Sequence, residues 1–473
     1  MIFSPLPNGQ RLQLRLSERR VLLMAGDVLA VIIAVLIALF VWSVVGRYRF
    51  TFDFVWPRSH WFVTLTGLWL LLASANDFYE LRISASRMAT FQRLVLITLQ
   101  MLVIYLVVFF LAGSLRLPRL FILYYGGASF VLIAVFRLLN PALAGWASQR
   151  RRVLVVGTDR ASAAIINTIA QEAQQVYDIR GIVGENGSGV IQIGDVPLRG
   201  TGKDLLRLAH EEGVSELIVT STHALTPETF AGLMDAYEAG LTIVPMPLLY
   251  ERITGQVPVE YLMNNWSVVL PIEGETIFDL YPVIKRLTDI LLSLVGAVAL
   301  ALLLPPLALI IKLDSPGAVF YSQERVGING RIFRVYKFRS MRANAEATTG
   351  AVFSREGDPR ITRVGRFMRK TRLDEGPQVI NILRGDMSVI GPRPERPEHV
   401  QRLVEKIPFY RTRHIIRPGL TGWAQVRYKY GSTDEDALVK LQYDLYYIRH
   451  QSLALDLNIM VRTVGKVIRM GGT

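Results

Sequence analysis

The chain has 473 residues, of which 51% are apolar and only 19% charged, and its mean hydropathy is +0.32. This composition is typical of a membrane protein, and the net charge of +14 favours contact with anionic lipid or phosphorylated substrates. The absence of cysteine excludes disulfides, thiolate catalysis and cysteine-ligated metal sites, and the six histidines form no HxxxH or HExxH pair typical of a transition-metal site.

Four apolar segments near the N-terminus each approach the length of about 20 residues that crosses a bilayer. They predict a four-span α-helical transmembrane domain over residues 1–148, and they cover residues 21–45, 61–76, 94–112 and 120–139. Basic residues precede the first segment, separate the second from the third and follow the fourth. The positive-inside rule therefore places everything after residue 148 in the cytoplasm. We expect no cleaved signal peptide, because the first segment is too long and lacks a cleavage site.

Asp27 is unusual because it lies inside the first apolar segment. Ionisable residues within membrane segments are rare and often functional. We expect a helix-packing or interfacial role for Asp27, with a functional intramembrane carboxylate as the alternative.

Residues 149–248 alternate between strand-like and helix-like segments, which predicts a Rossmann-like parallel α/β domain. Strands are expected at 152–157, 179–184, 216–220 and 241–244, and helices at 160–174, 203–212 and 226–239. The first turn begins Gly157-Thr158-Asp159 and lacks the G-x-G-x-x-G pattern that lets a backbone approach a pyrophosphate. We interpret the domain as structural or regulatory, with a dinucleotide site as the alternative, and residues 249–280 as a linker.

A fifth apolar segment, residues 290–311, is interrupted by Pro305 and Pro306, which predict a break in the helix. Lys285 and Lys312 flank the segment, so both ends suit the same basic membrane surface. A crossing here would place the rest of the chain outside, away from nucleotide sugars. We therefore predict a re-entrant membrane hairpin, with an ordinary kinked span as the alternative.

The remainder of residues 281–473 predicts an α+β catalytic domain with a cationic surface. Residues 331–339 alternate basic and apolar side chains, as in a strand with one cationic face. Residues 360–372 place apolar residues and arginines at helical spacing, which indicates a basic amphipathic helix suited to an anionic bilayer. Nucleic-acid binding is the competing interpretation, and the adjacent membrane segments argue against it.

Asp374 and Glu375 follow this basic helix. Nearby cations lower the pKa of a carboxyl group and keep it ionised, an ionised aspartate can attack phosphorus, and two acids suit Mg²⁺. Arg393 lies between Pro392 and Pro394, which predicts a rigid guanidinium clamp for a diphosphate. By itself an Asp-Glu dipeptide is more often a solvated surface pair.

Four motifs occur in order over residues 280–470: YKFRSM, Leu373-Asp374-Glu375, GDMSVIGPRP and RPGLTGWAQV. Together they resemble the bacterial sugar transferase family, the monotopic phosphoglycosyl transferases, which include undecaprenyl-phosphate glucose and galactose phosphotransferases. The upstream segments look like the large form of that family. Two positions depart from its pattern: Arg372 and Gly376 flank the dyad where Ser and Leu are frequent, and Pro305-Pro306 replaces Ser-Pro.

The resemblance implies that Asp374 attacks the β-phosphate of a UDP-sugar, with glucose or galactose favoured, and releases UMP. Undecaprenyl phosphate then takes the sugar phosphate from the aspartyl intermediate, Glu375 assists, and Mg²⁺ binds at Asp374 and Glu375. Further implications are a homodimer, no nucleic-acid partner, and a catalytic domain on the cytoplasmic face of the bacterial inner membrane, in the first membrane step of exopolysaccharide, O-antigen or capsule synthesis. Substrate- and phosphate-binding residues are expected at Lys337, Arg339, Arg369, Arg393 and Asp444.

Two other functions compete with this interpretation. A membrane-anchored nucleotide-sugar dehydratase or epimerase needs the missing glycine fingerprint and a Tyr-x-x-x-Lys pair. Tyr281 and Lys285 have that spacing but lie beyond the nucleotide fold. A non-catalytic scaffold for polysaccharide assembly is the second alternative, and loss of turnover in a folded Asp374→Asn protein would argue against it.

Overall fold

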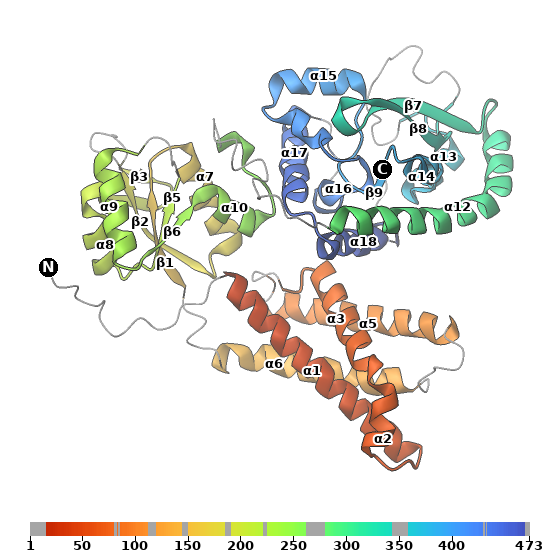
Figure 1. The fold of residues 1–473 in the computed structure, drawn as a ribbon, viewed down its shortest axis with the longest axis horizontal. Helices are drawn as coiled ribbons and strands as arrows, with labels where there is room; N and C mark the ends of the chain where they lie inside the picture. Colours follow the sequence, from red (N-terminus) through yellow and green to blue (C-terminus); the bar gives the residue numbers. More distant parts are fainter. Residues whose placement is uncertain are drawn as a thin grey trace. The chain divides into compact units, whose positions relative to one another are not determined.

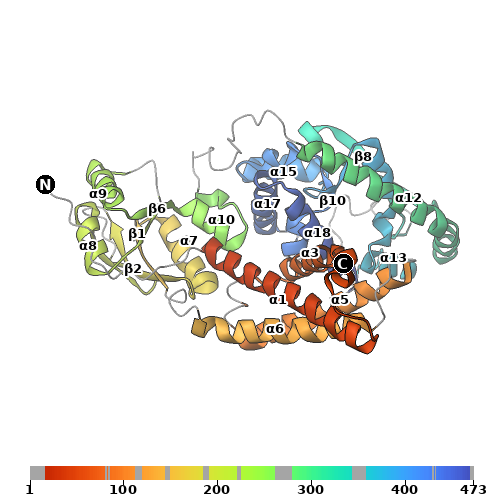
Figure 2. The same cartoon turned by 60° about the horizontal axis from the view of Figure 1, so that its bottom comes forward.

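The structure is a computed structural model. It describes residues 16–79, 83, 86–111, 120–143, 150–184, 191–220, 225–261, 280–342, 358–428, 431 and 433–468. The chain forms two compact units, Met1–Thr254 and Gly255–Thr473, and Figures 1 and 2 show the elements of each. The basic residues predicted before the first span fall largely outside the described residues.

The first unit begins with apolar helices at the predicted positions: α1 (Leu16–Val45), α3 (His60–Ala75), α5 (Arg87–Leu111) and α6 (Phe121–Leu143). Two short turns of helix, α2 (Phe52–Val55) and η1 (Trp56–Arg58), join α1 to α3. By length and composition, Val21–Val45 and Arg87–Val107 are long enough to cross a membrane, whereas the apolar parts of α3 and α6 are shorter. Four spans therefore remain a prediction.

Asp27 is completely buried within this bundle. Its Oδ2 lies 2.7 Å from Arg137 Nη2 of α6, and the Arg137 guanidinium lies over the Phe78 ring. A buried ion pair is costly to break, so it specifies one packing register of α1 against α6. This arrangement supports the packing role expected for Asp27.

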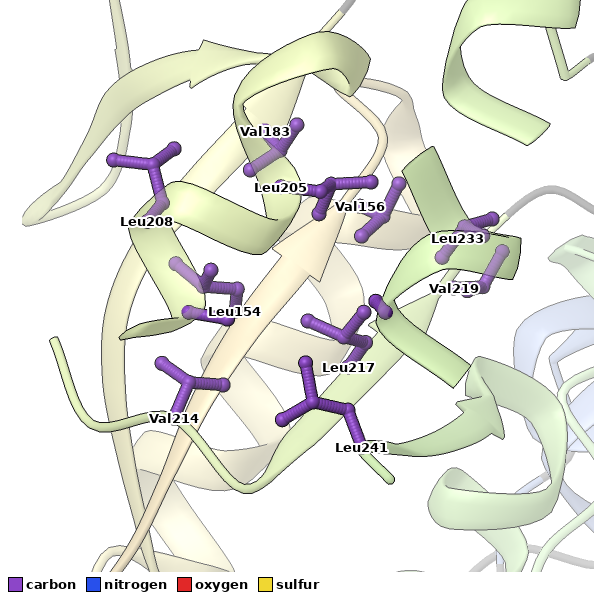
Figure 3. Close-up of a cluster of buried hydrophobic side chains, with 12 residues drawn as sticks. Leu154, Val156, Val183, Leu205, Leu208, Val214, Leu217, Val219, Leu233 and Leu241 are labelled. Atoms are coloured by element: carbon purple, nitrogen blue, oxygen red, sulfur yellow. The ribbon is translucent and has the colours of Figure 1, made fainter. Parts of the chain in front are cut away.

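The α/β domain is built on a sheet with strand order β3-β4-β2-β1-β5-β6. The predicted parallel strands are confirmed as β1 (Arg151–Val156), β2 (Tyr177–Gly184), β5 (Glu216–Val219) and β6 (Thr242–Pro245). The predicted helices are confirmed in part as α7 (Arg160–Thr168), continued by η2 (Ile169–Ala173), α8 (Leu205–Glu211) after a turn at η3 (Gly202–Asp204), and α9 (Pro227–Glu238). Figure 3 shows how Leu154, Val156 and Leu217 of the strands pack against Leu205 and Leu233 of the helices.

Three elements of this domain were not predicted, the strands β3 and β4 and the helix α10. The hairpin of β3 (Gln192–Ile193) and β4 (Val196–Thr201) extends the sheet beyond β2. β3 has only two residues, and β4 contains Pro197 and Gly200, residue types that are uncommon in strands. Helix α10 (Met246–Thr254) packs against α7 and buries Met246 and Leu249.

The first described part of the predicted linker 249–280 belongs instead to the two units. Residues 249–254 belong to α10 of the first unit. Residues 255–261, with η4 (Val259–Tyr261), belong to the second, where Val257 and Val259 are buried against Leu441 and Leu445. Residues 262–279 lie outside the described residues. Burial of apolar side chains in two different cores decided this boundary, which composition alone does not show.

The first turn of the α/β domain is filled by its own side chains. Asp159 Oδ1 accepts hydrogen bonds from Ser162 N and Ser162 Oγ, both at 2.9 Å, and so caps α7 where a pyrophosphate would bind. A Cβ added to Gly157 would lie 2.1 Å from Thr220 Oγ1. The structural or regulatory role of the domain stays a prediction.

The second unit is an α+β domain, as predicted. Its long helix α12 (Tyr281–Asp314) leads into the antiparallel hairpin β7 (Phe320–Val326) and β8 (Ile332–Phe338), joined through η5 (Ile328–Gly330), and the short strands β9 (Ser388–Ile390) and β10 (Gly419–Thr421) pair in parallel. The other elements are α13 (Arg363–Lys370), η6 (Leu373–Gln378), α14 (Val379–Arg384), α15 (Pro397–Lys406), η7 (Tyr410–His414), α16 (Trp423–Arg427), α17 (Asp434–Arg449) and α18 (Leu453–Ile468).

Helix α12 continues through Pro305 and Pro306, so the prediction that the helix breaks there is wrong. Each proline removes one amide donor, and the hydrogen bonds on either side hold the helix together, which gives a bend instead of an end. Figures 1 and 2 both show α12 changing direction along its length. Much of its apolar surface is uncovered, including Val295, Leu302 and Leu313, which are 71%, 74% and 78% exposed.

Both ends of α12 are bound to the same unit. Near its start, Lys285 Nζ lies 3.0 Å from Asp456 Oδ2, and Asp289 Oδ1 accepts a 2.9 Å hydrogen bond from Val389 N. At its end, Asp314 Oδ2 accepts a 2.9 Å hydrogen bond from Val364 N. Both ends of the helix are thus anchored, one side of it packs on the apolar cluster of Ile311 and Met368, and much of its remaining apolar surface is exposed.

Candidate active site

The predicted dyad lies at a turn between two helical segments. Thr362 caps the start of α13, and its Oγ1 accepts a 3.0 Å hydrogen bond from Gly365 N. After α13 the chain reverses at Arg372, which adopts the left-handed conformation with φ 59°, and enters η6. Leu373 packs into an apolar cluster with residues of α12, so it holds Asp374 and Glu375 in a buried position beside that helix.

Glu375 is the centre of a cluster of cations. Its Oε1 accepts hydrogen bonds from Arg393 Nη2 at 2.6 Å and Lys337 Nζ at 3.3 Å, and its Oε2 lies 3.6 Å from Arg372 Nη1. Burial raises the pKa of Glu375, but the positive charges of Arg393, Lys337 and Arg372 outweigh burial and hold that pKa below its ordinary value. Glu375 is therefore a stable carboxylate.

Asp374 has the opposite electrostatic balance. Burial and the negative charge of Glu375 raise its pKa, and the charges of Lys337, Arg369 and Arg372 oppose them without reversing the shift. The prediction that nearby cations lower the pKa of Asp374 is therefore wrong, because those cations are bound mainly to Glu375. Asp374 Oδ1 is buried and has no hydrogen-bond partner among the described residues. A carboxylate oxygen free of protein donors suits attack on phosphorus or binding of a cation.

Glycines bring the GDMSVIGPRP and RPGLTGWAQV motifs together. Gly391 N donates to Thr421 O at 2.9 Å, beside the paired strands β9 and β10. A Cβ added to Gly419 would lie 2.1 Å from Gly391 N, so side chains cannot be accommodated where the two segments cross. This close contact places Arg393, just after β9, within reach of Glu375.

The predicted binding residues fall into two groups. Lys337 and Arg393 meet at Glu375, and Arg369, whose Nε donates to Ser340 Oγ at 3.0 Å, contributes its charge at Asp374. Arg339 does not join them. Its guanidinium donates to Ser315 O at 2.5 Å and Pro316 O at 2.7 Å, so it caps the end of α12, and the expected phosphate contact is corrected to a structural one.

Asp444 is also turned to another partner. It is buried, and its Oδ2 lies 2.7 Å from Nη2 of Arg413, a residue that the sequence analysis missed. Arg413 is one of several arginines between residues 411 and 417, and nothing in their spacing distinguishes the buried one. Only the packing of η7 against α17 separates Arg413 from its exposed neighbour Arg411.

The dyad offers a limited set of metal ligands. Among the described residues there is no group of three or more His, Cys, Asp or Glu side chains able to hold a metal ion. Asp374 has one free oxygen, whereas Glu375 Oε1 already accepts from two cations. The residues therefore fit Mg²⁺ only if substrate phosphates and water supply most of its ligands, which is a usual arrangement for this cation.

Replacing Arg413 by methionine should strongly destabilise the second unit. Asp444 would remain buried without its partner, and breaking a buried ion pair costs about 3–5 kcal/mol. Thermal or denaturant unfolding of the solubilised protein would measure the loss. The matched control is Arg411→Met at an exposed position of the same turn, and the Arg413→Met/Asp444→Leu pair should recover most of the stability. Equal losses in the single and double variants would contradict this explanation.

Two family models match the chain. The model described as bacterial sugar transferase covers residues 280–470, and the model described as CoA-binding domain covers residues 74–224. The first contains the whole cluster around Glu375. The second covers α5, α6 and most of the α/β domain.

Curated relatives carry related names. A protein of Aeromonas hydrophila named UDP-N-acetylgalactosamine-undecaprenyl-phosphate N-acetylgalactosaminephosphotransferase is 41% identical over 250 residues, 52% of this chain and 57% of that relative. The Klebsiella pneumoniae UDP-glucose:undecaprenyl-phosphate glucose-1-phosphate transferase is 32% identical over 340 residues, 70% of this chain and 72% of the relative. The exopolysaccharide production protein PSS of Rhizobium leguminosarum is 42% identical over 194 residues, 40% of this chain and 97% of the relative.

The extent of these matches differs. The chain spans less than two thirds of the length of the Aeromonas relative, but 72% and 97% of the Klebsiella and Rhizobium relatives. Together with the family model over residues 280–470, these matches show that the chain belongs to the bacterial sugar transferase family.

Proposed function

We propose that this protein transfers a hexose-1-phosphate from a UDP-sugar to undecaprenyl phosphate and releases UMP, through a sugar-phosphoryl-aspartate at Asp374. The observation that carries the proposal is that Oδ1 of buried Asp374 has no hydrogen-bond partner among the described residues, whereas both oxygens of the neighbouring Glu375 lie against cations. The names of the relatives support the reaction class. The dehydratase or epimerase alternative is disfavoured, because Asp159 and Thr220 fill the turn that a dinucleotide would need.

In the first step, an oxygen of ionised Asp374 attacks the β-phosphorus of the UDP-sugar. The bond between the β-phosphorus and the bridging oxygen breaks, and UMP leaves with that oxygen and its electron pair. Lys337, Arg369 and Arg372 place positive charge around Asp374, where charge on the transferring phosphoryl group must be stabilised. The negative charge of Glu375 holds Lys337 and Arg393 in place. Because Glu375 is bound to these cations, it does not compete with Asp374 as a nucleophile.

In the second step, a phosphate oxygen of undecaprenyl phosphate attacks the same phosphorus. The bond between phosphorus and Asp374 breaks, which regenerates the carboxylate and leaves the sugar diphosphate on the lipid. One phosphoryl site serves both steps, because each replaces one oxygen on phosphorus by another. Mg²⁺, held by Asp374 and substrate phosphates, would favour the ionised carboxylate and neutralise phosphate charge when bound.

The re-entrant prediction for α12 gains support from its contacts. Both ends of the helix bind the same compact unit, and the apolar side chains that it exposes along its length suit a lipid environment. Gly376 of the dyad turn lies against this helix, since a Cβ there would be 3.4 Å from Leu300 Cδ1. We therefore place the site at the cytoplasmic surface of the inner membrane, where a soluble donor and a lipid acceptor both reach Asp374. The homodimer and the place in polysaccharide synthesis remain predictions.

Incubation with undecaprenyl phosphate, Mg²⁺ and a panel of UDP-glucose, UDP-galactose and UDP-N-acetylgalactosamine should release UMP from at least one donor. Asp374→Asn should abolish the release while the protein stays folded, and Glu405→Gln, an exposed acid, should leave it unchanged. Chromatography distinguishes UMP from UDP. Release of UDP would indicate ordinary glycosyl transfer and contradict the proposal.

The same assay, run without undecaprenyl phosphate, tests for the covalent intermediate. Without acceptor, release should stop at one UMP per active site, and intact-protein mass should increase by one hexose phosphate on Asp374. A wild-type protein that turns over with acceptor but never gains this mass would support direct transfer without an aspartyl intermediate.

Removal of divalent cations should reduce UMP release to background, because the residues at Asp374 cannot replace the positive charge of Mg²⁺ on the substrate phosphates. Chelation by EDTA followed by titration with MgCl₂ measures this requirement. Zinc chloride at equal concentration is the control for a hard oxygen-ligand site. Full activity in EDTA would show that the dyad works without a metal.

The orientation of α12 is testable because the chain has no cysteine. Leu280→Cys and Leu313→Cys introduce single thiols at positions that are 64% and 78% exposed. A membrane-impermeant maleimide should label both only in inside-out vesicles, whereas Tyr48→Cys, between α1 and α3, should be labelled only in intact cells. Labelling of Leu280→Cys and Leu313→Cys from opposite sides would establish a crossing helix.

A further inference from the structure

The segment that carries Arg393 is held by its backbone carbonyls. The four consecutive carbonyl oxygens of residues 392–395 each accept a hydrogen bond from another part of the second unit. The donors, in that order, are Gly419 N (2.8 Å), Arg413 Nη2 (3.1 Å), Arg325 Nη1 (3.2 Å) and Val326 N (2.9 Å). Because Pro392 and Pro394 have no N–H, the carbonyls are the main groups by which this segment can be fixed.

Arg325 reaches the segment from the hairpin that also carries Lys337. In the β7–β8 register, Arg325 pairs with Phe333 and Tyr321 with Lys337. Paired residues of an antiparallel ladder share a face, and so do residues two apart, so Arg325 and Lys337 lie on the same face. Arg325 Nη2 also donates to Gln323 Oε1 at 2.7 Å, and the Arg325 side chain is 17% exposed. One rigid hairpin thus contacts both Glu375 and the Arg393 segment.

Arg413, which follows residues 392–395 in the chain, contacts the same segment. Its side chain is 5% exposed, its Nη1 donates to Tyr410 Oη at 2.7 Å, and its Nη2 pairs with Asp444 at 2.7 Å. These two partners fix the guanidinium with Nη2 directed at the carbonyl of Arg393. Asp444 therefore contributes by orienting the guanidinium of Arg413.

We infer that Arg325 and Arg413 are positioning residues for the transfer reaction, which hold the backbone at Arg393 so that its guanidinium stays on Glu375. The inference rests on the proposed function. Among the contacts of the described residues, neither guanidinium makes a hydrogen bond or ion pair with Asp374 or Glu375, so both act through Arg393. A long arginine side chain is placed accurately only if its backbone is fixed, and small displacements in an active site have large effects on rate.

A double-mutant cycle tests this role. Arg325→Gln should lower kcat for UMP release roughly 10- to 100-fold, and Arg325→Lys, which keeps the charge but lacks the forked donor, should recover part of it. In an Arg393→Ala background, Arg325→Gln should cause no further loss, because the side chain that it positions is gone. The matched control is Arg334→Gln, an exposed arginine on the neighbouring strand, which should behave like the wild type.

The second position and a stability measurement separate positioning from general damage. Arg413→Lys keeps a cation beside Asp444 but should lower kcat for UMP release. In the Arg393→Ala background, Arg413→Lys should cause no further decrease in kcat. Thermal unfolding of every variant identifies any protein that is simply misfolded. Losses that multiply in the Arg393→Ala background, or an Arg325→Gln protein as active as the wild type, would overturn the inference. A wild-type protein that releases no UMP would instead overturn the proposed function, and this inference with it.

Discussion

The candidate site of the second unit depends on the pairing of the Glu375 carboxylate with three cations. Three cations from separate segments, Lys337 of β8, Arg372 after α13 and Arg393 after β9, approach this one buried carboxylate. A buried carboxylate without partners would be strongly destabilising, and three clustered cations without an anion would repel one another. Each side of the cluster is therefore stable only in the presence of the other, and the segments that carry them must meet.

The pairing of Glu375 with cations also determines the surroundings of Asp374. Since Glu375 binds the cations, Asp374 keeps a free oxygen in a buried position, and its pKa is raised by burial and by Glu375. Two adjacent acids thus acquire different roles from their surroundings alone. Under the proposed function, Glu375 organises the site and Asp374 is left available to react.

Helix α12 connects the apolar surface of the second unit to the dyad. The helix exposes apolar side chains over much of its length, yet its polar residues Lys285, Asp289 and Asp314 bind α18, β9 and the start of α13. Leu373, next to the dyad, packs into the apolar cluster that includes Ile311. The position of the dyad relative to the helix is consequently fixed by packing, and under the proposed function a helix in lipid would keep Asp374 close to the bilayer surface.

Local sequence patterns were enough to predict several helices and strands, the family and the candidate dyad. Hydrophobic periodicity was sufficient to locate the apolar helices and four of the parallel strands, because these patterns are local, and four ordered motifs identified the family and the dyad. The tertiary structure decided what depends on contacts between distant residues. It assigned Arg339 to the end of α12, paired Asp444 with Arg413, and gave the lowered pKa to Glu375 instead of Asp374. Charge is visible in a sequence, but which opposite charge it meets, and how deeply both are buried, is set only when the chain is folded.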